Sequence, residues 1–150
     1  MKLMICVAAC AAAGWIGSLW TMPNLRPWYA SLAKPSWTPP EWLFGPVWST
    51  LYLMMAVAAW LVWKHAGLTS APLRLFAFQL VLNALWSGIF FKLRLLGPAF
   101  FEIAVLWISI LATCVSFFRV SPVAGWLLVP YLIWVTYASG LNFSIWRLNS

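Results

Sequence analysis

Apolar residues run along this chain in five long stretches, separated by short breaks that contain cations, prolines and glycines. A helix that crosses the hydrocarbon core of a bilayer needs about 20 predominantly apolar residues. The pattern predicts five such spans, at residues 3–20, 44–63, 73–91, 98–118 and 124–146. A cation or a turn former lies at each break, where a helix would leave the hydrocarbon. We therefore predict an all-α integral membrane protein, a five-helix transmembrane bundle that forms one domain over residues 1–150.

The composition supports the membrane assignment. The chain is 65% hydrophobic and only 7% charged, whereas soluble domains contain about 25% charged residues. The first apolar run follows Met1-Lys2 and also resembles a secretory signal peptide. Because the run continues to Trp20, we favour a retained first span. Its small residues recur at four-residue spacing, as in Cys10, Gly14 and Ser18, which favours a closely packed inner helix.

The stretch from Trp28 to Trp48 is rich in both tryptophan and proline and lies between the first two spans. Proline fixes φ and removes a backbone donor, so this stretch cannot form one regular helix. A stiff connector with bulky aromatic side chains is poorly suited to be a flexible linker. We predict that this first loop is a cap that packs over a flat, apolar ligand.

The net charge of +7 comes from cations that lie singly at the ends of spans. This distribution indicates contact with anionic lipid headgroups and does not form a patch for nucleic acid. The cations divide almost equally between the two sides of the membrane, so the positive-inside rule leaves the orientation open. The two acids are Glu41 and Glu102, and we expect Glu102 to reach the interface.

The chain lacks the residues that conventional acid–base catalysis needs. His65 is the single histidine, and Cys6, Cys10 and Cys114 do not have the spacing of a zinc site. No set of nucleophile, base and orienting group can be assembled from these residues. We therefore expect no metal site and no conventional hydrolase.

Polar residues within the spans need another explanation, because each one costs free energy in hydrocarbon. Helical spacing places three groups of large aromatic and hydrogen-bonding side chains on three faces. They are Asn83, Trp86, Ser87 and Phe90; Trp134, Ala138, Leu141 and Asn142; and Trp48, Tyr52 and Met55. Together these faces can line one apolar pocket with a few polar contacts. Alternatively, Asn83 and Asn142 bond neighbouring helices and hold the bundle together.

Three motifs resemble those of the translocator protein family (TspO/MBR, once called peripheral benzodiazepine receptors). The first loop has W-Y-x-x-L-x-K-P-x-W-x-P-P followed by G-P-V-W-x-x-L-Y. The third span carries Q-L-x-L-N-x-L-W-S at residues 79–87, and the fifth carries V-P-Y-L-I-W-V-T-Y-A-S-G-L-N at residues 129–142. The resemblance implies a five-helix bundle, often a homodimer, that binds porphyrins and sterol-like or drug-like lipophiles. It also implies a pocket beneath the first loop.

Matched motif by motif, the resemblance implies a particular set of pocket residues: Tyr29, Trp37, Pro40, Trp48, Tyr52, Asn83, Trp86, Trp134 and Ala138. The chain departs from the animal members at a proposed cholesterol motif near the carboxyl end. Phe143 stands where that motif has tyrosine, which puts cholesterol recognition in doubt. The departure fits a bacterial member, placed in the bacterial cell membrane.

Three functions remain open. The first is a membrane receptor or binding protein for tetrapyrroles, whose carboxylates would meet Arg26, Lys34 or backbone donors of the first loop. The second is an enzyme that degrades porphyrin in light through Trp28, Trp37 and Trp134. The third is a plain transporter. In each case porphyrin is ligand or substrate, no cofactor is required, and the partners are membrane lipid and a second copy of the chain.

The third span contains a small-residue pair, Ala84 and Gly88, that can seat another helix. That helix can belong to a second protomer or to the same chain, and the sequence leaves both alternatives open.

Overall fold

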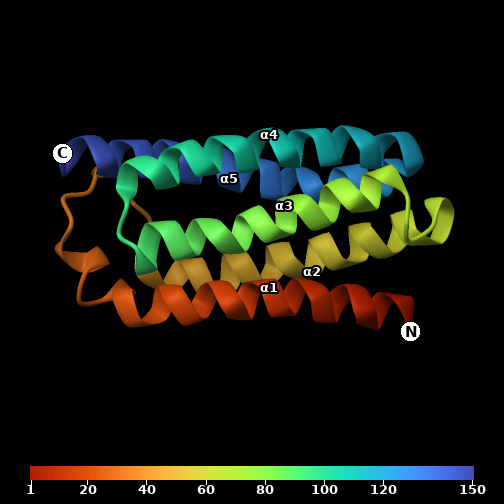
Figure 1. The fold of residues 1–150 in the computed structure, drawn as a ribbon, viewed down its shortest axis with the longest axis horizontal. Helices are drawn as coiled ribbons and strands as arrows, with labels where there is room; N and C mark the ends of the chain where they lie inside the picture. The colour runs from red at the N-terminus through yellow and green to blue at the C-terminus, as the bar shows by residue number, and fades with distance from the viewer.

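The computed structural model describes all 150 residues as a bundle of five long helices (Figure 1). The helices are α1 Lys2–Leu25, α2 Glu41–Ala66, α3 Ala71–Ser87, α4 Leu96–Val120 and α5 Pro122–Leu148, with a 3-10 turn η1 at Tyr29–Ser31 and a π-helical turn η2 at Gly88–Lys92. Five segments, counting α3 together with η2, are long and apolar enough to cross a membrane. The predicted all-α bundle is confirmed, and each predicted span falls on one of these helices.

With η2 counted as part of α3, the observed helical segments extend beyond the predicted spans by one to five residues at each end. The first span was predicted to end at residue 20, but α1 continues to Leu25. Hydropathy marks only the part of a helix that lies in hydrocarbon, whereas the backbone stays helical until a turn or cap ends it. Ser121 provides such a cap at the start of α5, where its hydroxyl accepts a hydrogen bond from the Ala124 amide.

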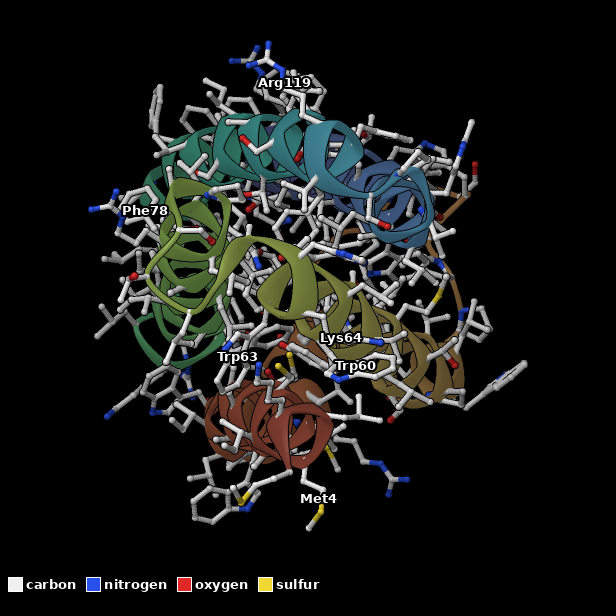
Figure 2. All side chains as sticks on the ribbon, turned by 90° about the vertical axis from the view of Figure 1, so that its right-hand side faces the viewer. Met4, Trp60, Trp63, Lys64, Phe78 and Arg119 are labelled. Atoms are coloured by element: carbon white, nitrogen blue, oxygen red, sulfur yellow. The ribbon has the colours of Figure 1, made fainter.

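Successive helices run in opposite directions, so the connections gather at two ends of the bundle. The amino terminus and the α2–α3 and α4–α5 connections lie at one end, and the carboxyl terminus and the α1–α2 loop lie at the other (Figure 1). Helix α4 packs mainly on α5 and α3, while α1 packs on α2 and α3. Viewed from the amino-terminal end, Met4, Phe78 and Arg119 point away from the bundle (Figure 2). Met4 and Phe78 are apolar, and such side chains face the acyl chains in a membrane. Arg119 lies in the last turn of α4, where a cation reaches the headgroups.

Helix α1 lies at the edge of the bundle, so the expectation of an inner helix was wrong. Only Cys6, Cys10, Ala13 and Gly17 of this helix are buried. These small residues form one seam against α2 and α3, while larger residues on the opposite face remain exposed. The small-residue pattern therefore indicates close packing on one side only.

The pair Ala84 and Gly88 receives a helix of the same chain. A Cβ atom added at Gly88 would lie 3.0 Å from the indole ring of Trp20 in α1. The close approach of α1 thus leaves little room for a larger side chain at this position. Of the two alternatives left open by the sequence, the structure shows the one within the protomer, and a homodimer remains a prediction that needs a different surface.

Cations at the helix ends lie over aromatic rings. The Lys64 ammonium is 4.7 Å from the ring centroid of Trp60, and the Lys2 ammonium is 5.6 Å from that of Trp63. Both pairs lie at the amino-terminal end, where Figure 2 labels Trp60, Trp63 and Lys64. Such pairs are typical of an interface at which an indole is half immersed and a cation reaches the headgroups.

Candidate ligand-binding site

The loop between α1 and α2 folds into a stiff cap around the side chain of Lys34. Its ammonium donates hydrogen bonds to the carbonyl oxygens of Tyr29 at 2.8 Å, Leu32 at 3.2 Å and Ala30 at 3.3 Å. It also lies 4.8 Å from the centroid of the Tyr29 ring. Lys34 therefore holds the loop together, and of the two cations suggested for ligand carboxylates only Arg26 lines the cavity described below.

The cap is fastened to the carboxyl-terminal half of α5 and to Asn149, the residue that follows this helix. Asn149 and Ala33 exchange two hydrogen bonds, one from the Ala33 amide at 3.1 Å and one from the Asn149 side-chain amide at 2.9 Å. The Tyr137 hydroxyl donates to the Trp37 carbonyl oxygen, and the two rings pack with centroids 5.4 Å apart. These contacts join segments that lie 100 residues or more apart in the chain and fix the cap against the bundle.

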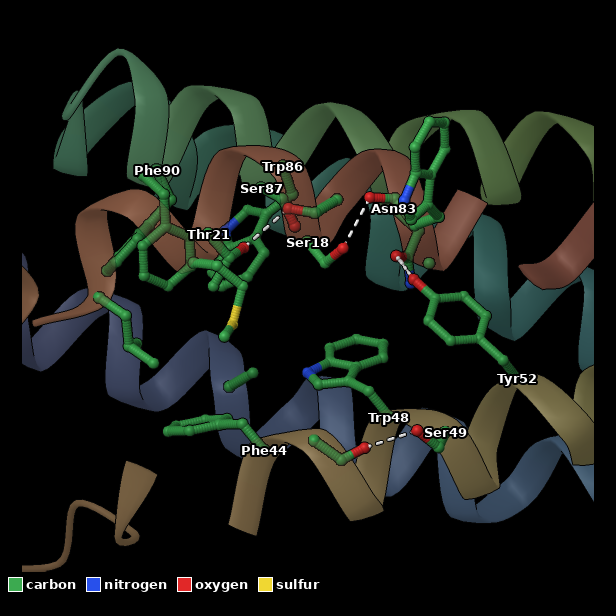
Figure 3. Close-up of a pocket in the computed structure, with 18 of the residues that line it drawn as sticks. Ser18, Thr21, Phe44, Trp48, Ser49, Tyr52, Asn83, Trp86, Ser87 and Phe90 are labelled. Atoms are coloured by element: carbon green, nitrogen blue, oxygen red, sulfur yellow. Dashed lines mark hydrogen bonds between the residues drawn. The ribbon is translucent and has the colours of Figure 1, made fainter. Parts of the chain in front are cut away.

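A cavity of about 1150 Å³ lies beneath the cap between α1, α2, α3 and α5. Figure 3 shows Trp48 projecting into it from α2, with Tyr52 and Asn83 at one end and Phe44 and Phe90 at the other. Seven residues predicted from the sequence line this one cavity together: Tyr29, Trp48, Tyr52, Asn83, Trp86, Trp134 and Ala138. Whether they contact a ligand remains a prediction.

Two predicted pocket residues lie outside the lining. Trp37 turns its ring toward Tyr137 and is 45% exposed, and Pro40 is the residue that precedes α2. Trp28, suggested for photochemistry, also lies outside, because its ring packs edge-on against Phe90 at 5.8 Å. Of the three tryptophans proposed for an enzyme, Trp134 alone lines the cavity.

A buried chain of hydrogen bonds forms the end of the cavity near Tyr52. The Tyr52 hydroxyl donates to Asn83 Oδ1 at 2.7 Å, and Asn83 Nδ2 donates to the Tyr131 hydroxyl at 2.6 Å. Tyr131 in turn donates to Gln79 Oε1 at 2.8 Å. The chain ties α2, α3 and α5 together, so every polar group in it has a partner inside the bundle.

Asn142 also joins neighbouring helices by hydrogen bonds, at a position nearer the cap. Its Oδ1 accepts a hydrogen bond from Trp86 Nε1 at 3.0 Å, and its Nδ2 donates to the Leu96 carbonyl oxygen at 3.0 Å. Asn83 and Asn142 both bond neighbouring helices and both line the cavity. The two alternatives considered for these residues therefore do not exclude each other.

Two donors that belong to cavity-lining residues have no hydrogen-bond partner: the Tyr29 hydroxyl and Trp134 Nε1 are both buried and unpaired. Burial raises the pKa of Tyr29 to about 12, with the nearby Glu41 carboxylate as a second cause. Tyr29 therefore remains a protonated donor at neutral pH. An unpaired buried donor costs about 1–3 kcal/mol, and a ligand acceptor that reached it would remove that cost.

Helix α1 supplies a wall of the cavity that was not predicted. Gly14, Ser18, Thr21 and Met22 all line it. These residues are small, weakly polar or flexible, and nothing in the sequence marks them as ligand-binding. The small size of Gly14 is the one available signal, because it lets α1 approach α2 so closely that a Cβ at this position would lie 2.9 Å from the Tyr52 ring.

Two further expectations are corrected by the structure. Met55 was placed on the pocket face of α2, but it is fully buried in the core, and Ala56 lines the cavity instead. Glu102 was expected to reach the interface, yet both of its carboxylate oxygens are buried without a partner. Glu102 lies six residues, about 9 Å, inside the start of α4, which is too far for its short side chain to reach the headgroups. No three His, Cys, Asp or Glu side chains come together as a metal site.

The sequence model of the TspO/MBR family matches residues 6–147. The tryptophan-rich protein TspO of Chlorobaculum tepidum is 44% identical, over 99% of this chain and 96% of its own length. The tryptophan-rich sensory protein of Cereibacter sphaeroides is 42% identical, over 95% and 88%. The human translocator protein is 44% identical, over 81% and 75%. This multi-pass integral membrane protein therefore belongs to the TspO/MBR family.

Proposed function

We propose that the chain is a membrane receptor that binds a flat, apolar ligand of the tetrapyrrole class, such as a porphyrin. The observation that carries this proposal is the cavity itself. It is closed above by the fastened cap, and its volume of about 1150 Å³ exceeds the usual range of about 300–1,000 Å³ for small-molecule sites. A cavity of this size suits a large ligand better than a small metabolite.

Aromatic rings on three helices favour a planar ligand. Phe44 and Trp48 of α2, Trp86 of α3 and Trp134 of α5 all line the cavity. Phe44 and Trp134 pack edge to face with centroids 6.0 Å apart, so the ring faces stand in different directions around the space. Aromatic faces pack well on a conjugated macrocycle and contribute about 0.5–1.5 kcal/mol per ring pair beyond the burial of area.

The polar groups favour a ligand with acceptor atoms at its edge. The unpaired donors of Tyr29 and Trp134 can serve a carbonyl, a ring nitrogen or a carboxylate. Arg26 is the one cation among the residues that line the cavity, and it is exposed on the cap side. A tetrapyrrole with acidic side chains would direct its carboxylates toward Arg26 and its ring toward the indoles.

The names of the relatives are compatible with a receptor or a carrier, because one is called a sensory protein and another a translocator protein. The bacterial relatives support a place in a bacterial cell membrane. Transport and homodimer formation are part of the proposal and have their own tests. Transport requires porphyrin flux into protein-containing vesicles above that of empty vesicles, and a dimer requires twice the protomer mass in detergent.

The direct test is a fluorescence titration of the purified protein in nanodiscs with protoporphyrin. Binding quenches tryptophan emission, and Trp134→Phe should raise Kd by about five- to tenfold, the equivalent of one lost hydrogen bond of roughly 1 kcal/mol. Trp126→Phe is the matched control, since Trp126 lies on the same helix, is 66% exposed and does not line the cavity. Equal Kd values for both variants and the unaltered protein would refute the site.

The same titration separates binding from light-driven degradation. Illumination should leave the porphyrin spectrum unchanged if the protein only binds. A new absorbing product that depends on Trp134 would favour the enzyme instead. The placement of Trp28 and Trp37 outside the lining favours binding.

A further inference from the structure

The cavity also extends sideways, to the surface that faces the bilayer. Several residues that line it are exposed on the outside of the bundle: Trp15 is 65% exposed, Met22 67% and Trp42 72%. The first two belong to α1 and the third to α2. The cavity is therefore continuous with the outer surface through a gap between these two helices. Building on the proposed function, we propose that the ligand enters and leaves from the bilayer through this gap, here called the α1–α2 portal.

The portal occupies the half of the bundle nearer the cap. Toward the amino-terminal end, α1 and α2 touch, because a Cβ at Gly14 would lie 2.9 Å from the Tyr52 ring. Nearer the cap, a Cβ added at Gly45 of α2 would meet nothing within 4 Å, although Gly45 lines the cavity. The two helices thus close the gap at one end and leave it open at the other.

The cap closes the route from water into the cavity, at the end of the bundle nearer the portal. The two hydrogen bonds between Asn149 and Ala33 hold the cap to α5, as does the bond from Tyr137 to the Trp37 carbonyl. Tyr29 of the cap is only 2% exposed. A ligand that came from water would have to break these contacts, whereas a ligand dissolved in the bilayer would break none of them.

The portal edges suit an apolar ligand. Ser18 and Ser49 line the cavity from the two helices, but each hydroxyl donates to its own helix, to the Trp15 carbonyl at 2.7 Å and the Gly45 carbonyl at 2.9 Å. These donors are therefore already used and do not need water. Figure 3 shows Ser18 and Ser49 on opposite sides of the cavity, with Trp48 between them. A planar lipophile can pass this edge without desolvating polar groups of the protein.

Substitution at Ser49 tests the portal against a neighbour on the same helix. Ser49→Phe places a ring in the portal, while Thr50→Phe places the same ring at an exposed position that does not line the cavity. Both native hydroxyls donate to the carbonyl four residues earlier at 2.9 Å, so each change costs the same local bond. Stopped-flow quenching with porphyrin-loaded vesicles should show association and dissociation slowed about tenfold or more by Ser49→Phe, with little change in Kd. Thr50→Phe should leave both rates unchanged.

Three results would overturn the portal: equal rates for the two variants, a Ser49→Phe effect confined to Kd through faster dissociation, or faster association in Asn149→Ala, which loosens the cap.

A second readout does not depend on porphyrin. In a background with the native cysteines replaced by alanine, Thr21→Cys puts a thiol on the cavity wall. A bilayer-dissolved alkyl maleimide should label it faster than a charged, water-soluble maleimide, and Ser49→Phe should slow the former. Faster labelling by the charged maleimide would reject the portal. This result would stand even if porphyrin binding, and with it the proposed function, had failed.

Discussion

Asn83 offers the sharpest test of how the buried polar chain holds the cavity open. It is 3% exposed and bonds Tyr52 of α2 and Tyr131 of α5 at 2.7 and 2.6 Å. Asn83→Ala removes both bonds. Tyr131 keeps Gln79 as its acceptor, but the Tyr52 hydroxyl is left without a partner in the protein.

The expected loss of stability follows from these contacts. Leaving one buried donor unpaired costs about 1–3 kcal/mol, and interhelical hydrogen bonds in membranes contribute about 0.6 kcal/mol on average. We therefore expect Asn83→Ala to lower the free energy of unfolding by about 2 kcal/mol. Tyr52→Phe should cost about 1 kcal/mol, since it removes a single bond. The double variant should cost no more than Asn83→Ala alone, which gives a coupling energy of about 1 kcal/mol.

The assay is unfolding of each variant by sodium dodecyl sulfate in mixed micelles, followed by circular dichroism. Ile133→Val serves as a control, because Ile133 is 64% exposed and its side chain makes no hydrogen bond, so the change should cost less than about 0.5 kcal/mol. Additive losses for Asn83→Ala and Tyr52→Phe, with no coupling, would show that the hydrogen bond between them does not stabilise the fold.

Three further predictions concern other unusual groups. Glu102→Leu removes two buried, unpartnered oxygens and should raise the free energy of unfolding by about 1–3 kcal/mol; a lower melting temperature would contradict this. Because the pKa of Tyr29 rises from 10 to about 12 on folding, this residue loses its proton first in the unfolded chain. The stabilisation that Tyr29 contributes should therefore be constant below pH 10 and fall by roughly 2–3 kcal/mol between pH 10 and 12. Tyr29→Phe should flatten this decline, and an unchanged slope would refute the assignment. Asn149→Ala should make the 26–40 loop more sensitive to protease, and unchanged cleavage would show that the two Asn149 bonds do not hold the cap.

The spans could be predicted from the sequence because the bilayer imposes a length and a composition on each helix. The ends of the helices could not be predicted. Helix α1 continues to Leu25 and α5 to Leu148, in the interface, where hydropathy no longer indicates whether the backbone is helical. The aromatic and polar residues of α2, α3 and α5 could be grouped by helical spacing, because large side chains such as Trp48 and Trp134 beside hydrogen-bonding groups are distinctive.

The remainder of the site depends on tertiary packing that the sequence does not display. Met55 and Ala56 are adjacent in α2, and the helix's rotation against its neighbours decides that Ala56 lines the cavity. Trp37 leaves the predicted pocket because its carbonyl and ring both engage Tyr137, a residue 100 positions later. The wall from α1 was missed because residues such as Gly14 act through their small size.

The most direct test of the central claim is an experimental structure of the protein with bound protoporphyrin. The account predicts that the macrocycle lies beneath the cap, between Trp48 and Trp134, with an acceptor atom of the ligand within hydrogen-bond distance of Trp134 Nε1. A porphyrin bound on the outer surface of the bundle, with the cavity beneath the cap filled by lipid or side chains, would contradict it.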